Sequence, residues 1–378
     1  GAGVIVSQSI GAKKSDTVKK SVHTAICISV IMGIILSVIG VIFSRILLVI
    51  MKTPSDVLDD SVLYLRIFSA GLIFNVIYNM ATGILNAAGN STKPLQYLAI
   101  ASVTNIILDL LFIRVFKMGV AGAAIATDIS QALSCVLAVA YLLRVKSDYK
   151  INIKELKIDK AIAKEIIRIG LPTAIQNAVI SFSNVLVQSS VNAYGSTAMA
   201  GYTAYLKIDG FNILPVLSIS MAVTTFTGQN VGAKNLKRVK KGMYDALIMC
   251  TIYTVLTGVF LLSLSHQILS LFTNDSAVIE YGQLAMKYFC PFYFLLGILN
   301  TLAGTVRGAG KGVPPMLILL FSMCIFRIFW IKLALPFFST IDGIFMLYPI
   351  SWSVGMIIMI IYTRYGKWLP QENKKNFD

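Results

Sequence analysis

Apolar stretches alternate with short polar segments along the whole chain. Each main stretch has about 18 or more residues, which is long enough for a helix to cross the hydrocarbon core of a bilayer. The pattern therefore predicts an all-α polytopic membrane protein. We expect a short apolar helix over residues 1–10 and ten spans over residues 21–46, 58–86, 94–115, 120–144, 163–193, 198–228, 242–271, 278–306, 314–337 and 342–365.

Composition agrees with this pattern. Hydrophobic residues make up 56% of the 378 residues, charged residues make up 13%, and the mean hydropathy is +0.77. A soluble domain has about 25% charged residues. The five cysteines all fall inside apolar stretches and none forms a CxxC pair, so we expect free, buried thiols and neither a disulfide nor a zinc site.

The basic residues predict the orientation in the membrane. The net charge is +16, and 24 of the 33 lysines and arginines fall in alternate loops and the C-terminal tail. By the positive-inside rule these loops and the C-terminus are cytoplasmic. We expect no nucleic-acid partner, because the chain has no soluble module with a basic, aromatic-rich patch.

An internal repeat divides the chain. The segments SQSIGAKKSDTVKK at 7–20 and GQNVGAKNLKRVKK at 228–241 share seven of 14 positions at an offset of 221 residues. The same offset relates GILNAAGNSTKP at 83–94 to GTVRGAGKGVPP at 304–315. The repeated unit has six helices, so both copies insert in the same direction.

The repeat predicts two pseudo-symmetric six-helix lobes. The second copy begins near residue 163, so the first copy is expected to lack its first helix and most of its second, as in an N-terminally truncated chain. The expected parts are an N-terminal lobe over 1–146, a cytoplasmic linker over 147–162, a C-terminal lobe over 163–366 and a cytoplasmic tail over 367–378.

One acidic residue inside a predicted span is the main candidate for function. Asn105 and Asp109 lie four residues apart in an apolar run, so they share one face of a helix. An ionised carboxylate at a helix centre costs about 2.5–3.5 kcal/mol, and intramembrane acids usually serve function. An amide oxygen and a carboxylate suit a small cation, and the carboxylate alone suits a proton. The alternative is a purely structural pairing of Asp109 with a neighbour such as Arg114.

Two six-helix halves, a GQN.GAK turn after the second helix of each half, YLRI at 64–67 and GAAIATDISQ at 122–131 together resemble the multidrug and toxic compound extrusion (MATE) transporters. The resemblance implies an inner-membrane antiporter that expels amphipathic, often cationic drugs in exchange for H⁺ or Na⁺. It also implies a first-lobe cation site to which Asn105, Asp109 and Thr127 contribute. Acids on helices seven and ten, which another branch carries, are absent here.

Other polar residues within spans have open roles. Asp128 is a possible proton relay or a paired acid near the outer end. Lys207 and Asp209 are expected to form a pair, or an outer gate. Two roles are open for a further set of polar residues, which either line a substrate cavity or form hydrogen bonds between helices. They are Asn75, Asn79, Gln131, Gln176 and Asn177.

The leading functional hypothesis is a cation-coupled antiporter that works as a monomer without a cofactor. A flippase for a lipid-linked saccharide is the alternative, and it would favour a cavity rich in arginine and lysine. An enzyme is not expected, because no HExxH motif, paired aspartates or GxxxxGK[ST] loop is present.

Overall fold

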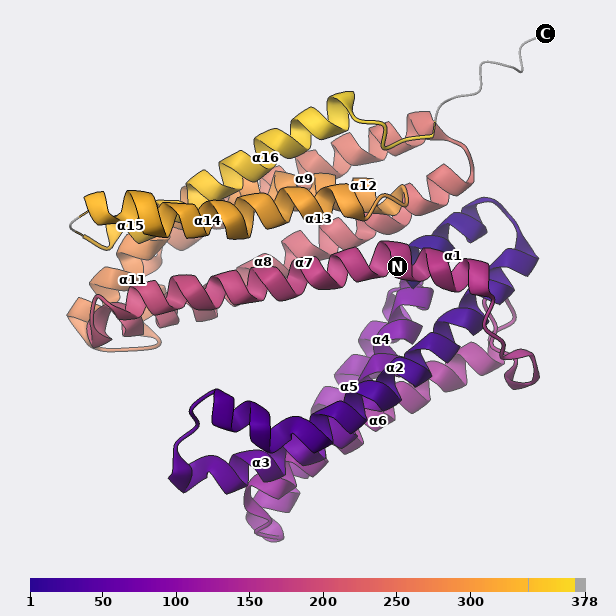
Figure 1. The fold of residues 1–378 in the computed structure, drawn as a ribbon, viewed down its shortest axis with the longest axis horizontal. Helices are drawn as coiled ribbons and strands as arrows, with labels where there is room; N and C mark the ends of the chain where they lie inside the picture. The colour runs from indigo at the N-terminus through magenta and orange to yellow at the C-terminus, as the bar shows by residue number, and fades with distance from the viewer. Residues whose placement is uncertain (339, 371–378) are drawn as a thin grey trace. The chain divides into compact units, whose positions relative to one another are not determined.

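The computed structural model describes residues 1–338 and 340–370, in which the regular secondary structure is entirely helical (Figure 1). The chain separates into two compact units, residues 1–167 and the residues from Arg168 onward. The expected tail at 367–378 lies largely outside the described residues.

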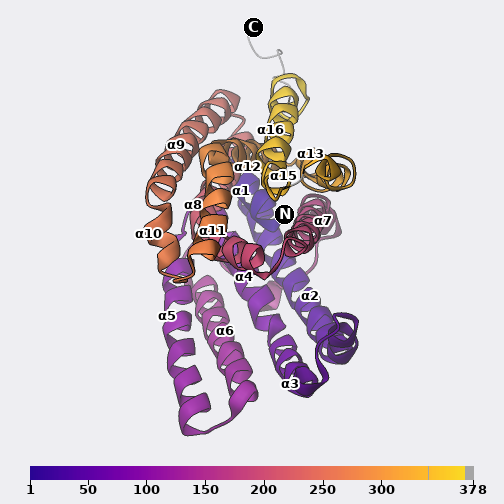
Figure 2. The same ribbon diagram turned by 90° about the vertical axis from the view of Figure 1, so that its left-hand side faces the viewer.

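The first unit is a bundle in which α2 packs against α1, α3 and α4, and α6 packs against α3, α4 and α5. Figure 2 shows α5 and α6 as an antiparallel pair. The elements are α1 (Ala2–Gly11), α2 (Ser15–Ile50), α3 (Ser55–Ala70), α4 (Leu72–Ala87), α5 (Thr92–Asp109), the π-helix η1 (Leu110–Val115), α6 (Gly119–Arg144) and the 3₁₀ turn η2 (Ile153–Glu155).

The second unit contains most of α7 (Lys160–Asn192) and the remaining helices. Its central helices are α8 (Ser196–Gly232) and α12 (Tyr293–Gly308), which pack against each other. The others are α9 (Leu236–Ser263), α10 (Ser265–Ser270), α11 (Ser276–Phe289), η3 (Cys290–Phe292), α13 (Val313–Leu320), η4 (Phe321–Ile325), α14 (Phe326–Phe329), η5 (Trp330–Ala334), η6 (Leu335–Phe337), α15 (Asp342–Phe345) and α16 (Leu347–Tyr365).

Eight helices of the described chain are long and apolar enough to cross a membrane, and the bent pair α3–α4 gives a ninth. The remaining predicted span, 163–193, corresponds to α7. This helix has 33 residues but is not among the nine candidate membrane spans. Its polar positions, which include Gln176 and Asn177, lower its hydropathy.

Several predicted spans are not continuous helices, and two of the breaks have a clear position. The span expected over 58–86 breaks at Gly71, where α3 and α4 meet at 44°. The span expected over 278–306 breaks at the 3₁₀ turn Cys290–Phe292, which contains Pro291. A proline lacks the amide N–H and disrupts a helix interior, which accounts for the second break.

The 221-residue repeat is present in the backbone. Lys13 and Lys234 both adopt left-handed conformations, with φ of 54° and 57°. In each case the next residue donates its amide to a carbonyl five residues earlier, which closes the helix end. Gly89 and Gly310, also 221 residues apart, have φ of 81° and 88°.

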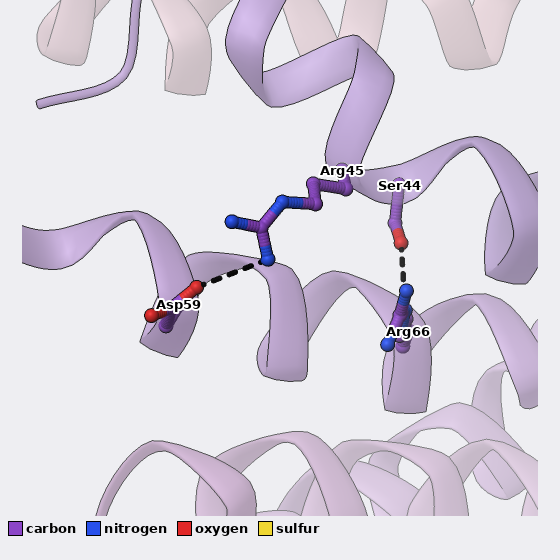
Figure 3. Close-up of polar contacts among 4 residues, drawn as sticks. All are labelled: Ser44, Arg45, Asp59 and Arg66. Atoms are coloured by element: carbon purple, nitrogen blue, oxygen red, sulfur yellow. Dashed lines mark hydrogen bonds and ion pairs between the residues drawn. The ribbon is translucent and has the colours of Figure 1, made fainter. Parts of the chain in front are cut away.

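Polar contacts join the C-terminal part of α2 to α3 (Figure 3). The Arg45 guanidinium lies 3.3 Å from the Asp59 carboxylate, and Nε of Arg66 donates to the Ser44 hydroxyl at 3.2 Å. The ion pair is exposed, and such pairs contribute about 0–1 kcal/mol. The hydroxyl gives Arg66 a structural partner within its span.

Candidate functional site

Helix α5 places Asn105 and Asp109 one turn apart. Asp109 is the last α-helical residue, and the π-helix η1 begins directly after it. Short π-helical segments often occur at functional sites, since they change the register of the side chains that follow. The sequence pattern located the two side chains, but it gave no signal for the π-helix.

Polar atoms of both side chains are enclosed without a partner. Nδ2 of Asn105 and Oδ1 of Asp109 are buried and form no hydrogen bond within the described residues. A buried polar atom left without a partner costs about 1–3 kcal/mol. Across residues 1–338 and 340–370, the ion pair found is Arg45–Asp59, so the alternative pairing of Asp109 with Arg114 is wrong. Within the described residues the Asp109 carboxylate oxygen is therefore left without a partner and can take a cation or proton, whereas Nδ2 of Asn105 is a donor and cannot coordinate a cation.

Helix α6 carries the next part of the candidate site and packs along α5. Thr127 donates its hydroxyl hydrogen to the carbonyl oxygen of Ala123 at 2.9 Å, so its oxygen lone pairs face outward from that bond. Oε1 of Gln131 is buried without a partner. In the described part of the chain no hydrogen bond joins Thr127 to Asn105 or Asp109. The three side chains therefore lie on two neighbouring helices but do not form a hydrogen-bonded cluster.

Asp128 has a different environment from its neighbour Thr127. Its carboxyl group lies directly against the backbone of Gly71, at the break between α3 and α4. Its Oδ1 atom is buried and has no hydrogen-bond partner among the described residues. Successive helical residues point about 100° apart. Asp128 therefore faces the helix break.

The residues suggested for a substrate cavity have mixed surroundings. Nδ2 of Asn79 donates to the side-chain and backbone oxygens of Asn75, at 2.8 and 2.9 Å. Gln176 is buried, whereas its neighbour Asn177 is exposed. A role in binding substrate stays a prediction for all four, as it does for Gln131.

The oxygens available at Asn105, Asp109 and Thr127 are an amide, a carboxylate and a hydroxyl. Hard oxygen ligands of this kind suit Na⁺, and the carboxylate suits a proton. Within the described residues, no group of three or more His, Cys, Asp or Glu side chains is placed to hold a metal ion.

Two basic side chains within the spans of the second unit, Arg327 and Lys207, have local contacts. Arg327 is buried, donates to Ser351 and Asn184, and lies 4.4 Å from the Tyr348 ring centre. Lys207 lies over the ring of Phe272 instead of pairing with Asp209, so the expected pair is wrong.

Comparison with known proteins agrees with this architecture. A family model described as MatE matches residues 1–111 and 172–331. The probable multidrug resistance protein YoeA of Bacillus subtilis is 29% identical, over 97% of this chain and 81% of the relative. The probable multidrug resistance protein NorM of Thermotoga maritima is 25% identical, over 98% of this chain and 79% of the relative.

Solved structures show the same fold. A MOP superfamily transporter from Pyrococcus furiosus matches with a TM-score of 0.90 at 21% identity, over 96% of this chain and 82% of that chain. An outward-facing multidrug resistance MATE family transporter also gives 0.90, at 20% identity and the same coverage. Because the MatE model matches more than half of the sequence, the chain belongs to the multidrug and toxic compound extrusion family of membrane transporters.

Proposed function

We propose that this protein exports amphipathic, often cationic organic compounds across the inner membrane in exchange for inward-moving H⁺ or Na⁺. Asn105, Asp109 and Thr127 bind the coupling ion, and Asp128 relays a proton. The observation that carries the proposal is the buried Oδ1 atom of Asp109, which has neither a hydrogen-bond partner nor a counter-ion within the described residues.

The chemistry of the site supports coupling. A carboxylate without a counter-ion is costly inside a span, so binding of a cation or proton lowers the free energy of the loaded state. The ion then leaves when the site becomes hydrated on the cytoplasmic side. One inward charge yields about 2.3 kcal/mol per 100 mV, and every 1.4 kcal/mol supports about tenfold accumulation of substrate.

The names of the relatives support drugs as the exported substrates. YoeA and NorM are called probable multidrug resistance proteins, and several other relatives, from Staphylococcus aureus, are called multidrug export proteins. The flippase alternative is less well supported, because Arg66 and Arg327 already donate to side chains of their own unit. A lipid-linked diphosphate would need such groups free.

The test is ion-dependent transport by the complete protein in vesicles, with the pH gradient and the Na⁺ gradient varied separately. We expect one of these gradients to drive uptake of a fluorescent cationic dye into inverted vesicles. Asp109→Asn should abolish that uptake, because an amide can neither take up a proton nor neutralise Na⁺.

Asp60→Asn is the matched control, since it makes the same change at an exposed acid of α3. It should leave dye uptake near the level of the parent protein. Gradient-driven uptake by Asp109→Asn at the parent rate, with equal amounts of protein in the vesicles, would contradict the proposal.

A further inference from the structure

A further acidic residue within the spans lies in the second unit. Asp209 is in the middle of α8, and its Oδ1 atom is buried without a hydrogen-bond partner among the described residues. Lys207, two positions earlier, lies over Phe272 and does not neutralise it. Residues two apart on a helix point to different sides, which is why this lysine cannot reach the carboxylate.

Two tyrosine hydroxyls lie beside this carboxylate. Tyr205, one turn earlier on α8, and Tyr293, the first residue of α12, approach the Asp209 carboxyl group. The two hydroxyl oxygens are 2.9 Å apart and share one hydrogen bond. One of the two hydrogens therefore remains free to be donated, and both oxygens keep lone pairs. Both tyrosines are almost fully buried, at 4% and 2% exposure.

The remaining titratable and charged groups around Asp209 leave it without a counter-ion. Tyr202 on α8 hydrogen bonds Tyr348 on α16 at 2.6 Å, and Arg327 on α14 lies over the Tyr348 ring. Both tyrosines lie near Arg327 and near Asp209, but within the described residues no ion pair joins the guanidinium to the carboxylate. Cys290, in the turn before α12, is also near Tyr293.

We propose that Asp209, together with the hydroxyls of Tyr205 and Tyr293, forms a second binding site for a small cation, either a proton or Na⁺. A carboxylate in this enclosed position lacks a compensating charge, which strongly favours a bound cation or proton. The carboxylate and phenol oxygens are hard ligands that suit either one. The site is built entirely from the second unit and needs neither Asn105 nor Asp109.

The protein contains its own reporter for this site. Trp352 on α16 packs against Tyr293, with ring centroids 6.2 Å apart. The other two tryptophans, Trp330 and Trp368, can be replaced by phenylalanine so that Trp352 alone fluoresces. The full-length protein in lipid nanodiscs is then titrated from alkaline to acidic pH, once in NaCl and once in choline chloride.

We expect a fluorescence transition that disappears in Asp209→Asn and persists in Asp109→Asn and in the exposed control Asp245→Asn. A transition that moves to lower pH in NaCl identifies Na⁺ as a ligand, and equal midpoints in both salts identify a proton site. Tyr293→Phe keeps the carboxylate and removes one hydroxyl, so it should shift the midpoint without removing the transition.

A transition in Asp209→Asn that matches the parent would overturn the proposal, as would a transition lost in Asp109→Asn. If Asp209→Asn does not fold, an unshifted midpoint in Tyr293→Phe would overturn it equally. Because the readout is fluorescence, loss of transport through the first-unit site does not affect it.

Discussion

At the scale of single residues, the carboxyl group of Asp128 lies directly against Gly71, at the break between α3 and α4. Gly71 ends α3 and precedes α4, so it lies at the N-terminus of α4, while its own N–H donates to the Ile67 carbonyl oxygen at 3.3 Å. A negative charge near a helix N-terminus is stabilising by about 0.3–1 kcal/mol. A side chain at position 71 would occupy the space of the Asp128 carboxyl group. The break in the span therefore depends on a glycine and an acid that are far apart in the sequence.

Gly71→Ala is expected to destabilise the protein, because its Cβ would overlap the Asp128 carboxyl group. A shift of roughly 1–3 kcal/mol is typical of overpacking. Asp128→Ala in the same chain should recover at least half of the loss by removing the overlapping atoms. Thermal unfolding in detergent, followed by size-exclusion chromatography, measures both effects.

Gly83→Ala is the control for this pair. Gly83 is on α4 and no atom lies within 4 Å of the position of an added Cβ, so alanine there should be neutral or slightly stabilising. Equal melting temperatures for Gly71→Ala and Gly83→Ala would show that the contact has no energetic role.

Sequence reasoning found Asn105 and Asp109 because each is polar in an otherwise apolar run. It did not find the partner of Asp128, since that contact depends on how α6 packs against α3 and α4. It paired Lys207 with Asp209 from proximity in sequence alone, and helical geometry separates them.

At the scale of elements, α2 holds the segment that leads into α7. Nδ1 of His23 lies 2.7 Å from the Lys19 carbonyl oxygen, and Nε2 accepts from the Asn152 amide at 3.0 Å. The two bonds together require a neutral imidazole with its proton on Nδ1. The Thr24 hydroxyl accepts from the amide of Asp159 at 3.0 Å, and makes a second attachment.

Removal of the imidazole should loosen this attachment, because the Asn152 amide then loses its acceptor on α2. We expect tryptic cleavage at Lys150 and Lys154 to be faster in His23→Phe than in the parent protein.

Cleavage at Lys237 in the same sample is the internal reference, since it corrects for differences in trypsin activity between samples. The ratio of the two cleavage rates is the measured quantity. An equal ratio in His23→Phe and in the parent protein would show that His23 does not control access to this segment.

The positions of the helices could be predicted from hydropathy, but their interruptions could not. A window of apolar residues does not report whether its hydrogen bonds follow the α or the π pattern, as at Leu110–Val115. Proline is a residue that disrupts a helix interior, so the break at Pro291 has a cause in the sequence itself, whereas at Gly71 the sequence does not show that the Asp128 carboxyl group packs against the break.

At the scale of the whole molecule, the repeat and the charge distribution together predict the topology. The turns at Lys13 and Lys234 have the same backbone conformation and hydrogen bonds. Two copies of one unit, each with an even number of helices, insert with the same orientation. The lysine-rich turns are therefore expected on one side of the membrane, and the loop at 272–275 on the other.

Single cysteines in a chain without its native cysteines test this orientation. Lys237→Cys should react with a membrane-impermeant maleimide only in inverted vesicles, and Asn274→Cys only in right-side-out vesicles. Both positions are exposed. Labelling of both from the same side would contradict the proposed topology and the cytoplasmic C-terminus.

The left-handed backbone conformation of Lys13 and Lys234 links the stability of the fold to the lipid composition of the membrane. A side chain in this conformation costs roughly 1–2 kcal/mol, and glycine would avoid the cost. A lysine near an anionic leaflet gains about 1 kcal/mol, so we expect attraction to acidic headgroups to offset much of the backbone penalty at Lys13 and Lys234. Lys52 and Lys117 are also left-handed but lie in loops expected on the opposite side. Membranes poor in acidic lipids would leave that penalty uncompensated at the turns of Lys13 and Lys234, and the fold should be less stable in them.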